Sequence, residues 1–381
     1  MKPFRIHHLL SILSQFDVSN LPLDVFLNKY FRQHSSIGSK DRQEICEKLY
    51  ILIRWQRLID YFIPDATSWE KRLDIILDRS IDTLRREPNI PKDIQVSFPK
   101  FFYNLLVDSL GEDRALDFCL NSNESAPITI RTNSLKTARD LLFEKWKNEF
   151  LITKCELSPE GITFFRRTNL FQLPEFKEGL FEMQDEGSQL VAKQIKAVSG
   201  DHVLDFCAGS GGKTLAFAPA MEGKGQIYLY DIRPHALLEA KKRLKRAGIQ
   251  NAQILDQEKL KKKGLLKRMN WILLDVPCSG SGTLRRNPDM KEKFKLEDLD
   301  RLIQEQRAIF ATALKYLSDD GKIVYATCSV LPQENMNQVN YFLEKYNLQL
   351  ENEPFSSFPQ KNNMDGFFSA VLSHKQKPSF A

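Results

Sequence analysis

The sequence has no long hydrophobic run and no regular cysteine spacing. Its 381 residues include six cysteines, none of which forms a CxxC pair: 46, 119, 155, 207, 278 and 328. This spacing indicates neither a zinc site nor a disulfide framework, so no metal is expected. The first residues, MKPFRIHHLLSILSQF, lack the apolar core of a signal peptide, and no later run approaches the length of a membrane span. We therefore expect a reduced, cytoplasmic protein without membrane contact.

Internal repeats and low-complexity segments are also absent, and the net charge is modest. A chain of 381 residues exceeds one ordinary domain, so two or more are expected. The formal charge of +6 is small against 55 Lys and Arg residues, so it favours an anionic partner without establishing one. The basic residues cluster at 241–246, at 259–268 and at the pair Arg285-Arg286. A solvated helix face is the alternative for the first two clusters.

The first third of the chain has a helical pattern. From residue 3 to about 122, apolar positions recur at intervals of three and four, as in DRQEICEKLYILIRWQRLIDYF. This predicts an all-helical domain over residues 1–122 with five or six helices. Arg42, Arg54 and Arg57 could face RNA, but a solvated surface or an interdomain contact is equally compatible.

The pattern changes near residue 123, where strands begin. ITIRTN at Ile128 to Asn133 predicts a strand, followed by the helix ARDLLFEKWKNEF, in a small α/β segment over residues 123–181. From 182 to 375 strands alternate with helices, and Asp185 or Ser188 is available as the first helix cap. The alternation predicts a parallel, doubly wound sheet with right-handed crossovers. MDGFFSAVLSHK is expected to add a last edge strand, and the lysine-rich tail KQKPSFA beyond it to be frayed.

A glycine-rich turn lies at Val203 to Thr214, VLDFCAGSGGKT, between a strand and a helix start. Glycines let the backbone approach a ligand, and a helix N-terminus offers unpaired N–H groups. A phosphate-binding Walker A loop would need glycine where Cys207 stands, which disfavours a nucleotide hydrolase. Lys213 opposes the helix dipole and therefore needs an acidic partner, for which Asp275 is a candidate.

Four aspartates stand at the ends of successive strands: Asp205, Asp231, Asp256 and Asp275. An acidic residue that ends the second strand of such a unit accepts hydrogen bonds from ribose hydroxyls, which suits Asp231. A carboxylate after the third strand, Asp256, suits an adenine amino group or its surroundings. An acidic pocket without a phosphate clamp fits a cationic nucleoside cofactor, S-adenosylmethionine. Helix capping is the alternative for any single one of the four.

Two cysteines each follow an apolar run that predicts a buried strand. Cys278 lies in LLDVPCSGSGTLRRNPD and Cys328 in YATCSVLPQEN. Open α/β sheets carry their chemistry at strand ends, and a thiolate is a nucleophile at neutral pH, so the pair suggests one reactive site. The residues alone do not say which cysteine attacks, and buried structural cysteines are the alternative.

From Pro127 to Leu372 the chain resembles the Sun/RsmB-type family (NSUN in eukaryotes) of S-adenosylmethionine-dependent RNA cytosine-C5 methyltransferases. The matching segments are IRTN, MQDEGSQLVA, CAGSGGKT, YDIRPHAL, LDVPCSGSGTLRRNPD, YATCSVLPQEN and GFFSAVL. Gly209-Ser210 departs from the Ala-Pro of many members. The N-terminal helices are similar to the NusB-like RNA-binding extension of bacterial members.

The resemblance implies roles for the matching residues. Cys328 would attack carbon 6 of cytosine, Cys278 would assist release of the methylated RNA, and Asp275 would contact N3 and the exocyclic amine of the base. The cofactor would be held by Cys207, Ala208, Gly209, Ser210, Gly211, Gly212, Lys213, Asp231, Asp256 and Asp275. Arg285 and Arg286 are expected to hold RNA phosphates, and Arg131 and Asn133 either extend that surface or dock the small α/β segment.

The expected fold class is therefore α/β: a Rossmann-like doubly wound methyltransferase domain, preceded by a small α/β segment and an all-helical N-terminal domain. The predicted function is methylation of carbon 5 of cytosine in an unstacked region of RNA. Ribosomal RNA is favoured over tRNA because the helical extension resembles that of bacterial members. A catalytically silent RNA-binding or ribosome-assembly factor is the alternative. We expect a monomer.

Overall fold

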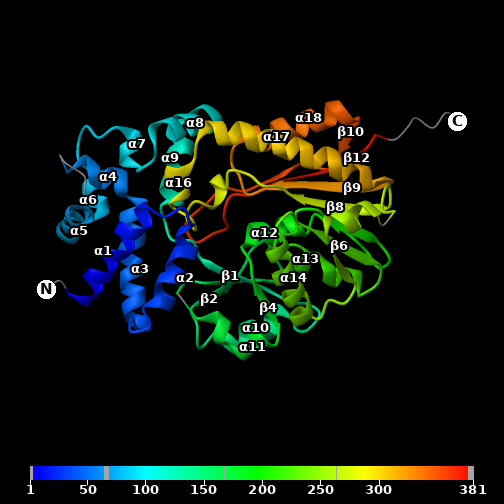
Figure 1. Cartoon of the computed structure of the whole chain (residues 1–381), viewed down its shortest axis with the longest axis horizontal. Helices are drawn as coiled ribbons and strands as arrows, with labels where there is room; N and C mark the ends of the chain where they lie inside the picture. Colours follow the sequence, from blue (N-terminus) through cyan, green and yellow to red (C-terminus); the bar gives the residue numbers. More distant parts are fainter. Residues whose placement is uncertain (1–2, 64–67, 167, 263, 376–381) are drawn as a thin grey trace. The chain divides into compact units, whose positions relative to one another are not determined.

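The computed structural model describes residues 3–63, 68–166, 168–262 and 264–375 (Figure 1). The chain forms two compact units. One comprises Met1–Ser125 and Thr283–Lys295, and the other comprises Ala126–Gly282 and Leu296–Ala381. The chain therefore leaves the second unit directly after the Cys278 loop, contributes a short segment to the helical unit, and returns. Most of the predicted frayed tail lies outside the described residues.

The helical unit contains nine described α-helices before residue 123, more than the five or six predicted, and six of them have ten or more residues. Their bounds are α1 Phe4–Asp17, α2 Leu23–Gln33, α3 Ser39–Arg54, α5 Trp69–Asp78, α8 Lys100–Leu110 and α9 Glu112–Ser122. Shorter helices lie between them: α4 Gln56–Tyr61, α6 Ile81–Arg85 and α7 Lys92–Gln95. In α3, the buried residues Ile45, Leu49 and Leu52 recur at helical spacing and pack into one apolar core.

The segment Thr283–Lys295, which contains α16 (Met290–Lys293), is anchored in the helical unit by polar contacts. The Lys291 side chain is buried, and its Nζ donates to the Arg54 carbonyl oxygen at 2.5 Å and to Asn123 Oδ1 at 2.8 Å. Arg54 Nη2 in turn donates to the Arg285 carbonyl oxygen at 3.0 Å. A buried amine needs hydrogen-bond acceptors of this kind, and these contacts make the segment an integral part of the helical unit.

The second unit begins with a small antiparallel sheet of strand order β2-β3-β1-β4. Its strands are β1 Ile128–Thr132, β2 Ile152–Lys154, β3 Gly161–Phe164 and β4 Phe181–Met183, with helices α10 Arg139–Trp146 and α11 Pro174–Lys177. Trp146 is buried against Phe164 and Phe181, so α10 covers the sheet through one aromatic cluster.

The large sheet has the order β10-β12-β9-β8-β5-β6-β7, and β11 also pairs with β12. The strands are β5 His202–Asp205, β6 Gln226–Tyr230, β7 Ala252–Leu255, β8 Met269–Asp275, β9 Leu317–Thr327, β10 Leu348–Leu350, β11 Phe355–Ser356 and β12 Phe368–His374. Strands β7, β6, β5, β8 and β9 run parallel, whereas the last three pair antiparallel. The Rossmann-like fold class is confirmed.

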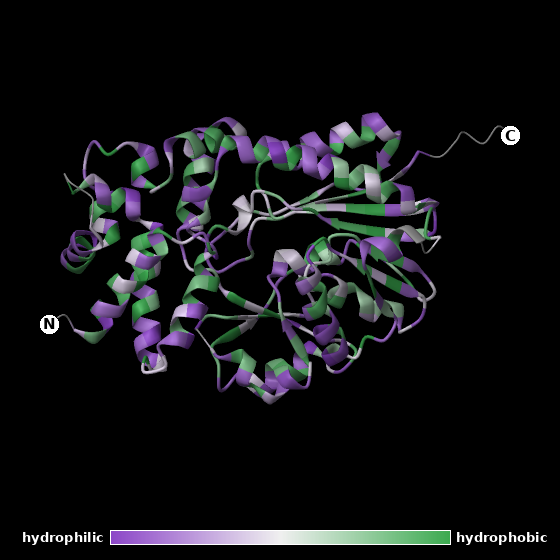
Figure 2. Ribbon diagram, in the orientation of Figure 1, coloured by the Kyte–Doolittle hydropathy of each residue, from purple (hydrophilic) through white to green (hydrophobic). Residues whose placement is uncertain are grey.

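Helices cover both faces of this sheet (Figure 1). They are α12 Glu186–Ala192, α13 Thr214–Phe217, α14 Pro234–Ala247, α15 Gln257–Lys262, α17 Leu296–Ala313 and α18 Met336–Tyr346. Along β8, Ile272 belongs to the core under α17 and α18, and its neighbour Leu273 to the core under α13 and α14. Both faces of the strand are therefore buried, which explains its continuous apolar run and the hydrophobic colouring of the central strands in Figure 2.

Two details of this unit differ from the prediction. The strand of MDGFFSAVLSHK, β12, is not at the edge: it pairs with β9 on one side and with β10 and β11 on the other. Its residues from Phe368 to Ser373 are all buried, as an internal position requires. The helix after the glycine turn is also short, because α13 gives way at Ala218 to a 3-10 turn where Pro219 lacks the N–H that an α-helix would use. The predicted cap at Asp185 is confirmed, since its carboxylate accepts the Gly187 N–H.

Candidate active site

The carboxyl ends of β5, β6, β8 and β9 bring the predicted catalytic residues to one edge of the sheet. Asp205 pairs in register with Leu229 and Leu273, and Asp275 pairs with Ala326, two residues before Cys328. Asp231 directly follows β6. Because neighbouring parallel strands end together, residues separated by more than a hundred positions form one site.

The two cysteine thiols face each other. Cys278 Sγ and Cys328 Sγ lie 3.4 Å apart, and both cysteines are free. The hydrogen bond from the Cys278 thiol lowers the pKa of Cys328, and the nearby charge of Lys213 also lowers it, against the opposing effects of burial and Asp275. The pKa of Cys278 is raised well above its ordinary value by the same hydrogen bond and by burial. Cys328 is thus the better thiolate of the pair.

Lys213 and Asp275 form the predicted ion pair. Lys213 Nζ donates to Asp275 Oδ2 at 2.5 Å, and the lysine side chain is only 10% exposed. Burial by itself would lower the pKa of Lys213, but Asp275 outweighs it and the pKa is raised. Lys213 therefore remains a cation beside the thiol pair, at the start of α13.

Asp231 is buried and accepts hydrogen bonds on both carboxylate oxygens. Oδ2 accepts the Gly209 N–H at 2.7 Å, and Oδ1 accepts the Arg233 N–H at 2.8 Å. The Arg233 guanidinium also contacts both oxygens, at 3.0 and 3.1 Å. Burial raises the pKa of Asp231, but the hydrogen bonds outweigh burial and the pKa is lowered. The carboxylate is therefore ionised and can accept ribose hydroxyls.

The turn between β5 and α13 leaves room for a ligand. Gly209 and Gly211 have φ of 52° and 78°, conformations that favour glycine, and a Cβ at Gly212 would meet no atom within 4 Å. Asp205 is fully buried, and its Oδ1 has no hydrogen-bond partner in the described part of the chain. A glycine turn surrounded by carboxylates, with its nearby lysine already paired, fits a cationic nucleoside cofactor.

Cys207 and Ser210 have different surroundings within this turn. Burial raises the pKa of Cys207 well above its ordinary value, so it is a packed thiol. Ser210 Oγ accepts a hydrogen bond from Arg243 Nη1 at 2.7 Å, and Arg243 also pairs with the buried Glu182 of β4. Sequence reasoning missed Arg243, because it lies in the 241–246 basic cluster whose expected roles were solvation or an anionic partner.

Asp256 lies apart from these contacts. Its side chain is 58% exposed, and its Oδ1 accepts the Lys259 N–H at 2.7 Å, the geometry of a helix cap on α15. This is the alternative considered for any single strand-end aspartate. The adenine contact of Asp256 stays a prediction.

Three of the four residues predicted to contact RNA are buried. Arg131 donates through Nε to Gln184 Oε1 at 2.7 Å, and Asn133 donates to the carbonyl oxygens of Gly179 and Ala247. Asn133 therefore joins the small α/β segment to the end of α14, the docking role weighed in the sequence. The Arg285 side chain is 1% exposed within the helical unit, whereas Arg286 is half-buried. Burial of these three side chains argues against a direct contact with an RNA phosphate.

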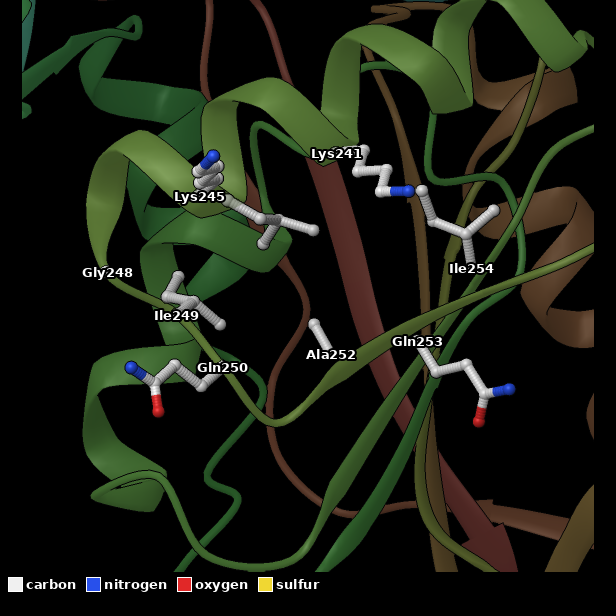
Figure 3. Close-up of a pocket in the computed structure, with 9 residues that line it drawn as sticks. Lys241, Lys245, Gly248, Ile249, Gln250, Ala252, Gln253 and Ile254 are labelled. Atoms are coloured by element: carbon white, nitrogen blue, oxygen red, sulfur yellow. The ribbon is translucent and has the colours of Figure 1, made fainter.

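An open cavity of about 460 Å³ lies away from the cysteines. It is bounded by the end of α14 and the first residues of β7, and Figure 3 shows its lining side chains, Lys241 and Ile254 among them. Strand β7 is the last of the sheet order, and lysines are common protection for such an edge. The chemistry of the thiol pair lies instead at the opposite, carboxyl ends of the strands.

Comparison with known proteins places this geometry in a family. Residues 192–373 match the sequence model of the 16S rRNA methyltransferase RsmB/F family. The chain is 30% identical over 300 residues to a probable ribosomal RNA small subunit methyltransferase B from Synechocystis sp., covering 73% of this chain and 67% of that protein. The chain belongs to the RsmB/F methyltransferase family. It is also 31% identical over 260 residues to the ribosomal RNA small subunit methyltransferase B of Proteus mirabilis, and there it spans only 60% of the relative.

Solved structures show the same fold. The crystal structure of PH0851 superposes with a TM-score of 0.83, at 22% identity, over 98% of this chain and 99% of that chain. A methyltransferase homologue from Pyrococcus horikoshii gives 0.66 at 25% identity, over 74% of this chain and 98% of its own. The predicted family and the predicted cofactor, S-adenosylmethionine, are confirmed by the RsmB/F membership.

Two features are absent from the residues that the structure describes. None of their helices is long and apolar enough to cross a membrane. They also contain no group of three or more His, Cys, Asp and Glu side chains placed to hold a metal ion.

Proposed function

We propose that this RsmB/F member methylates carbon 5 of cytosine in RNA, with ribosomal RNA as the substrate, through a covalent adduct on Cys328. The observation that carries the proposal is the thiol pair, 3.4 Å apart, beside the Lys213–Asp275 ion pair at the carboxyl ends of β8 and β9. The names of the relatives, ribosomal RNA small subunit methyltransferase B, support ribosomal RNA over tRNA.

Cys328 supplies the nucleophile. Its lowered pKa favours the thiolate, which adds to carbon 6 of cytosine and makes carbon 5 nucleophilic. S-adenosylmethionine, when bound, supplies the methyl group as an electrophile. Loss of the carbon-5 proton and elimination of the Cys328 thiolate then restore the aromatic ring. The covalent step is needed because carbon 5 of an unmodified cytosine is a poor nucleophile.

Asp275 would contact the target base, and Cys278 would assist release of the methylated RNA. Asp275 is one-third exposed, at 34%, which leaves its carboxylate within reach of N3 and the exocyclic amine of an unstacked cytosine. Cys278 holds its proton toward Cys328, so it is placed to assist the elimination that frees the methylated RNA. Asp231 and the turn at Gly209 to Gly212 would hold the cofactor.

The reacting pair also argues against a silent RNA-binding factor. A protein that only binds RNA needs no pair of thiols in contact, with the pKa of one lowered and of the other raised. A ribosomal RNA substrate is consistent with the expected cytoplasmic location.

The test is transfer of labelled methyl groups from S-adenosylmethionine to unmodified ribosomal RNA, small ribosomal subunits and tRNA, with wild type and Cys328→Ala compared. Nucleoside analysis then identifies the product. The expected result is 5-methylcytidine in ribosomal RNA or subunits, absent with the variant. Label in tRNA alone would correct the substrate, and no transfer to any RNA would support the silent binding factor.

A further inference from the structure

A fully buried carboxylate links the two cysteine loops. Glu334 lies six residues after Cys328, at the end of a 3-10 turn, with 0% of its surface exposed. Its Oε1 accepts the Ser279 N–H at 2.9 Å and Gln306 Nε2 at 3.0 Å, and its Oε2 accepts the Ser279 hydroxyl at 2.5 Å. Both oxygens are therefore satisfied, and two of these three bonds go to the residue that follows Cys278.

The same network holds the residue that precedes Cys278. Gln306, on α17, uses its Nε2 to donate to the Pro277 carbonyl oxygen at 3.0 Å as well as to Glu334. The Tyr325 hydroxyl lies 2.7 Å from the Glu334 carbonyl oxygen and 3.0 Å from Gln306 Oε1. The backbone on both sides of Cys278 is thus tied, through Gln306 and Glu334, to the turn that follows Cys328.

Three serine hydroxyls complete the connection. Ser279 Oγ lies 3.1 Å from Ser281 Oγ and 3.2 Å from Ser329 Oγ, and the latter two are 3.0 Å apart. Ser329 is the neighbour of Cys328 in the chain. Since Ser279 gives its single proton to Glu334, its oxygen can act only as an acceptor toward the other two hydroxyls.

Three charged groups face the thiol pair, and they act differently on Cys278 and Cys328. They are the Lys213 ammonium at the start of α13, the Asp275 carboxylate at the end of β8, and Glu334. Glu334 acts on both thiols and raises both pKa values, whereas Lys213 lowers that of Cys328. Glu334 accepts the backbone N–H of Ser279, the neighbour of Cys278, so its negative charge disfavours a thiolate at Cys278.

We propose that Glu334 is a positioning residue that keeps Cys278 protonated and oriented as the hydrogen-bond donor to the Cys328 thiolate. It acts through Ser279 and Gln306, without touching the substrate. The inference rests on the proposed function, which assigns Cys328 as the nucleophile. What it describes is the protonation of the two thiols before RNA binds. It also gives a physical reason for the order of the two cysteines, which the sequence residues alone left open.

The test is alkylation of the full-length protein by iodoacetamide across a range of pH, without RNA, with peptide mapping to separate Cys278 and Cys328 from the other four cysteines. In wild type, Cys328 is expected to react faster than Cys278 at neutral pH. Glu334→Gln keeps the side-chain size and can still accept the Ser279 N–H, but it removes the charge. Because Glu334 raises both pKa values, we expect both thiols to titrate at lower pH in this variant, Cys278 by the larger amount, and the preference for Cys328 to fall by about three- to tenfold.

Glu186→Gln is the matched control, because Glu186 is likewise a buried carboxylate that accepts backbone N–H groups, in its case from Leu157 and Ser158. Its alkylation profile should follow wild type. An unchanged preference and unchanged titration in Glu334→Gln would overturn the proposal. If that variant does not fold, Ser279→Ala replaces it: losing the hydroxyl between Glu334 and the cysteine loops should lower the preference at least about threefold, and no change would overturn the proposal.

Alkylation and methyl transfer separate the two claims. Methyl transfer by wild type, together with an unaltered thiol preference in the Glu334 variant, refutes only the role of Glu334. An altered thiol preference in a protein that transfers no methyl group to any RNA refutes only the proposed reaction.

Discussion

The Arg233 guanidinium contacts both carboxylate oxygens of Asp231, one at 3.0 Å and the other at 3.1 Å. The arginine side chain is 59% exposed, whereas the carboxylate side chain is 4% exposed. Asp231 is the residue expected to accept the ribose hydroxyls of the cofactor. We therefore predict that Arg233 and the ribose compete for the same oxygens.

We predict that Arg233→Ala tightens binding of S-adenosylmethionine by about two- to fivefold, because a solvent-exposed ion pair contributes little and its loss frees the carboxylate. Asp231→Asn should weaken binding at least about tenfold, since a charged acceptor is lost. Isothermal titration calorimetry measures both. Weaker binding in Arg233→Ala would show that the arginine contacts the cofactor instead of competing with it.

Lys213 is predicted to support the thiolate of Cys328. Lys213→Met removes the cation that lowers the pKa of Cys328, so the pKa of that thiol should rise. Activity at neutral pH should fall at least about tenfold, and the acidic limb of the pH–rate profile should move to higher pH. Lys242→Met on α14, with a side chain 78% exposed, is the control and should retain the wild-type profile. An acidic limb that stays in place would exclude this role.

Asp205 is predicted to make folding stability depend on pH. Burial raises the pKa of its carboxyl from 3.8 to about 7. The unfolded chain loses this proton near pH 4, but the folded protein keeps it until about pH 7, so the folded state binds more protons in between. Stability from this group is therefore fully present below pH 4 and declines as the pH rises to about 7, by up to about 4 kcal/mol.

Asp205→Asn should remove this decline, since an amide does not ionise and its oxygen still accepts the Thr214 hydroxyl that Asp205 holds at 2.6 Å. Urea denaturation at pH 5 and pH 8, without cofactor, compares the slopes. Asp319→Asn, whose parent side chain is 86% exposed, should behave as wild type. An equal pH dependence in wild type and Asp205→Asn would mean that Asp205 is ionised in the folded protein.

Much of the fold was predictable because its signals are local. Hydrophobic runs gave the central parallel strands, and Asp185 was correctly identified as a helix cap. The predicted edge position of β12 was wrong, because periodicity predicts that a strand exists but not between which strands it inserts. The segment FSAVLS contains no charged residue, and all six of its residues are buried in the structure. The lack of charge was the sequence signal for an internal position.

The candidate site divides in the same way. The Lys213–Asp275 pair was predicted from a local conflict, a cation at the start of a helix, and is confirmed. Glu334 and Arg243 were missed because their importance depends on partners far away in the chain, Ser279 and Glu182. A basic cluster in a sequence does not show which of its side chains turn inward to meet a buried carboxylate.

The most direct test of the central claim is to trap the covalent intermediate. Cys278→Ala, incubated with S-adenosylmethionine and unmodified small-subunit ribosomal RNA, should accumulate a protein–RNA adduct that survives denaturing electrophoresis. The adduct should map to Cys328 and be absent from the Cys278→Ala, Cys328→Ala double variant. No adduct in Cys278→Ala, under conditions in which wild type methylates the RNA, would contradict the division of roles between the two thiols.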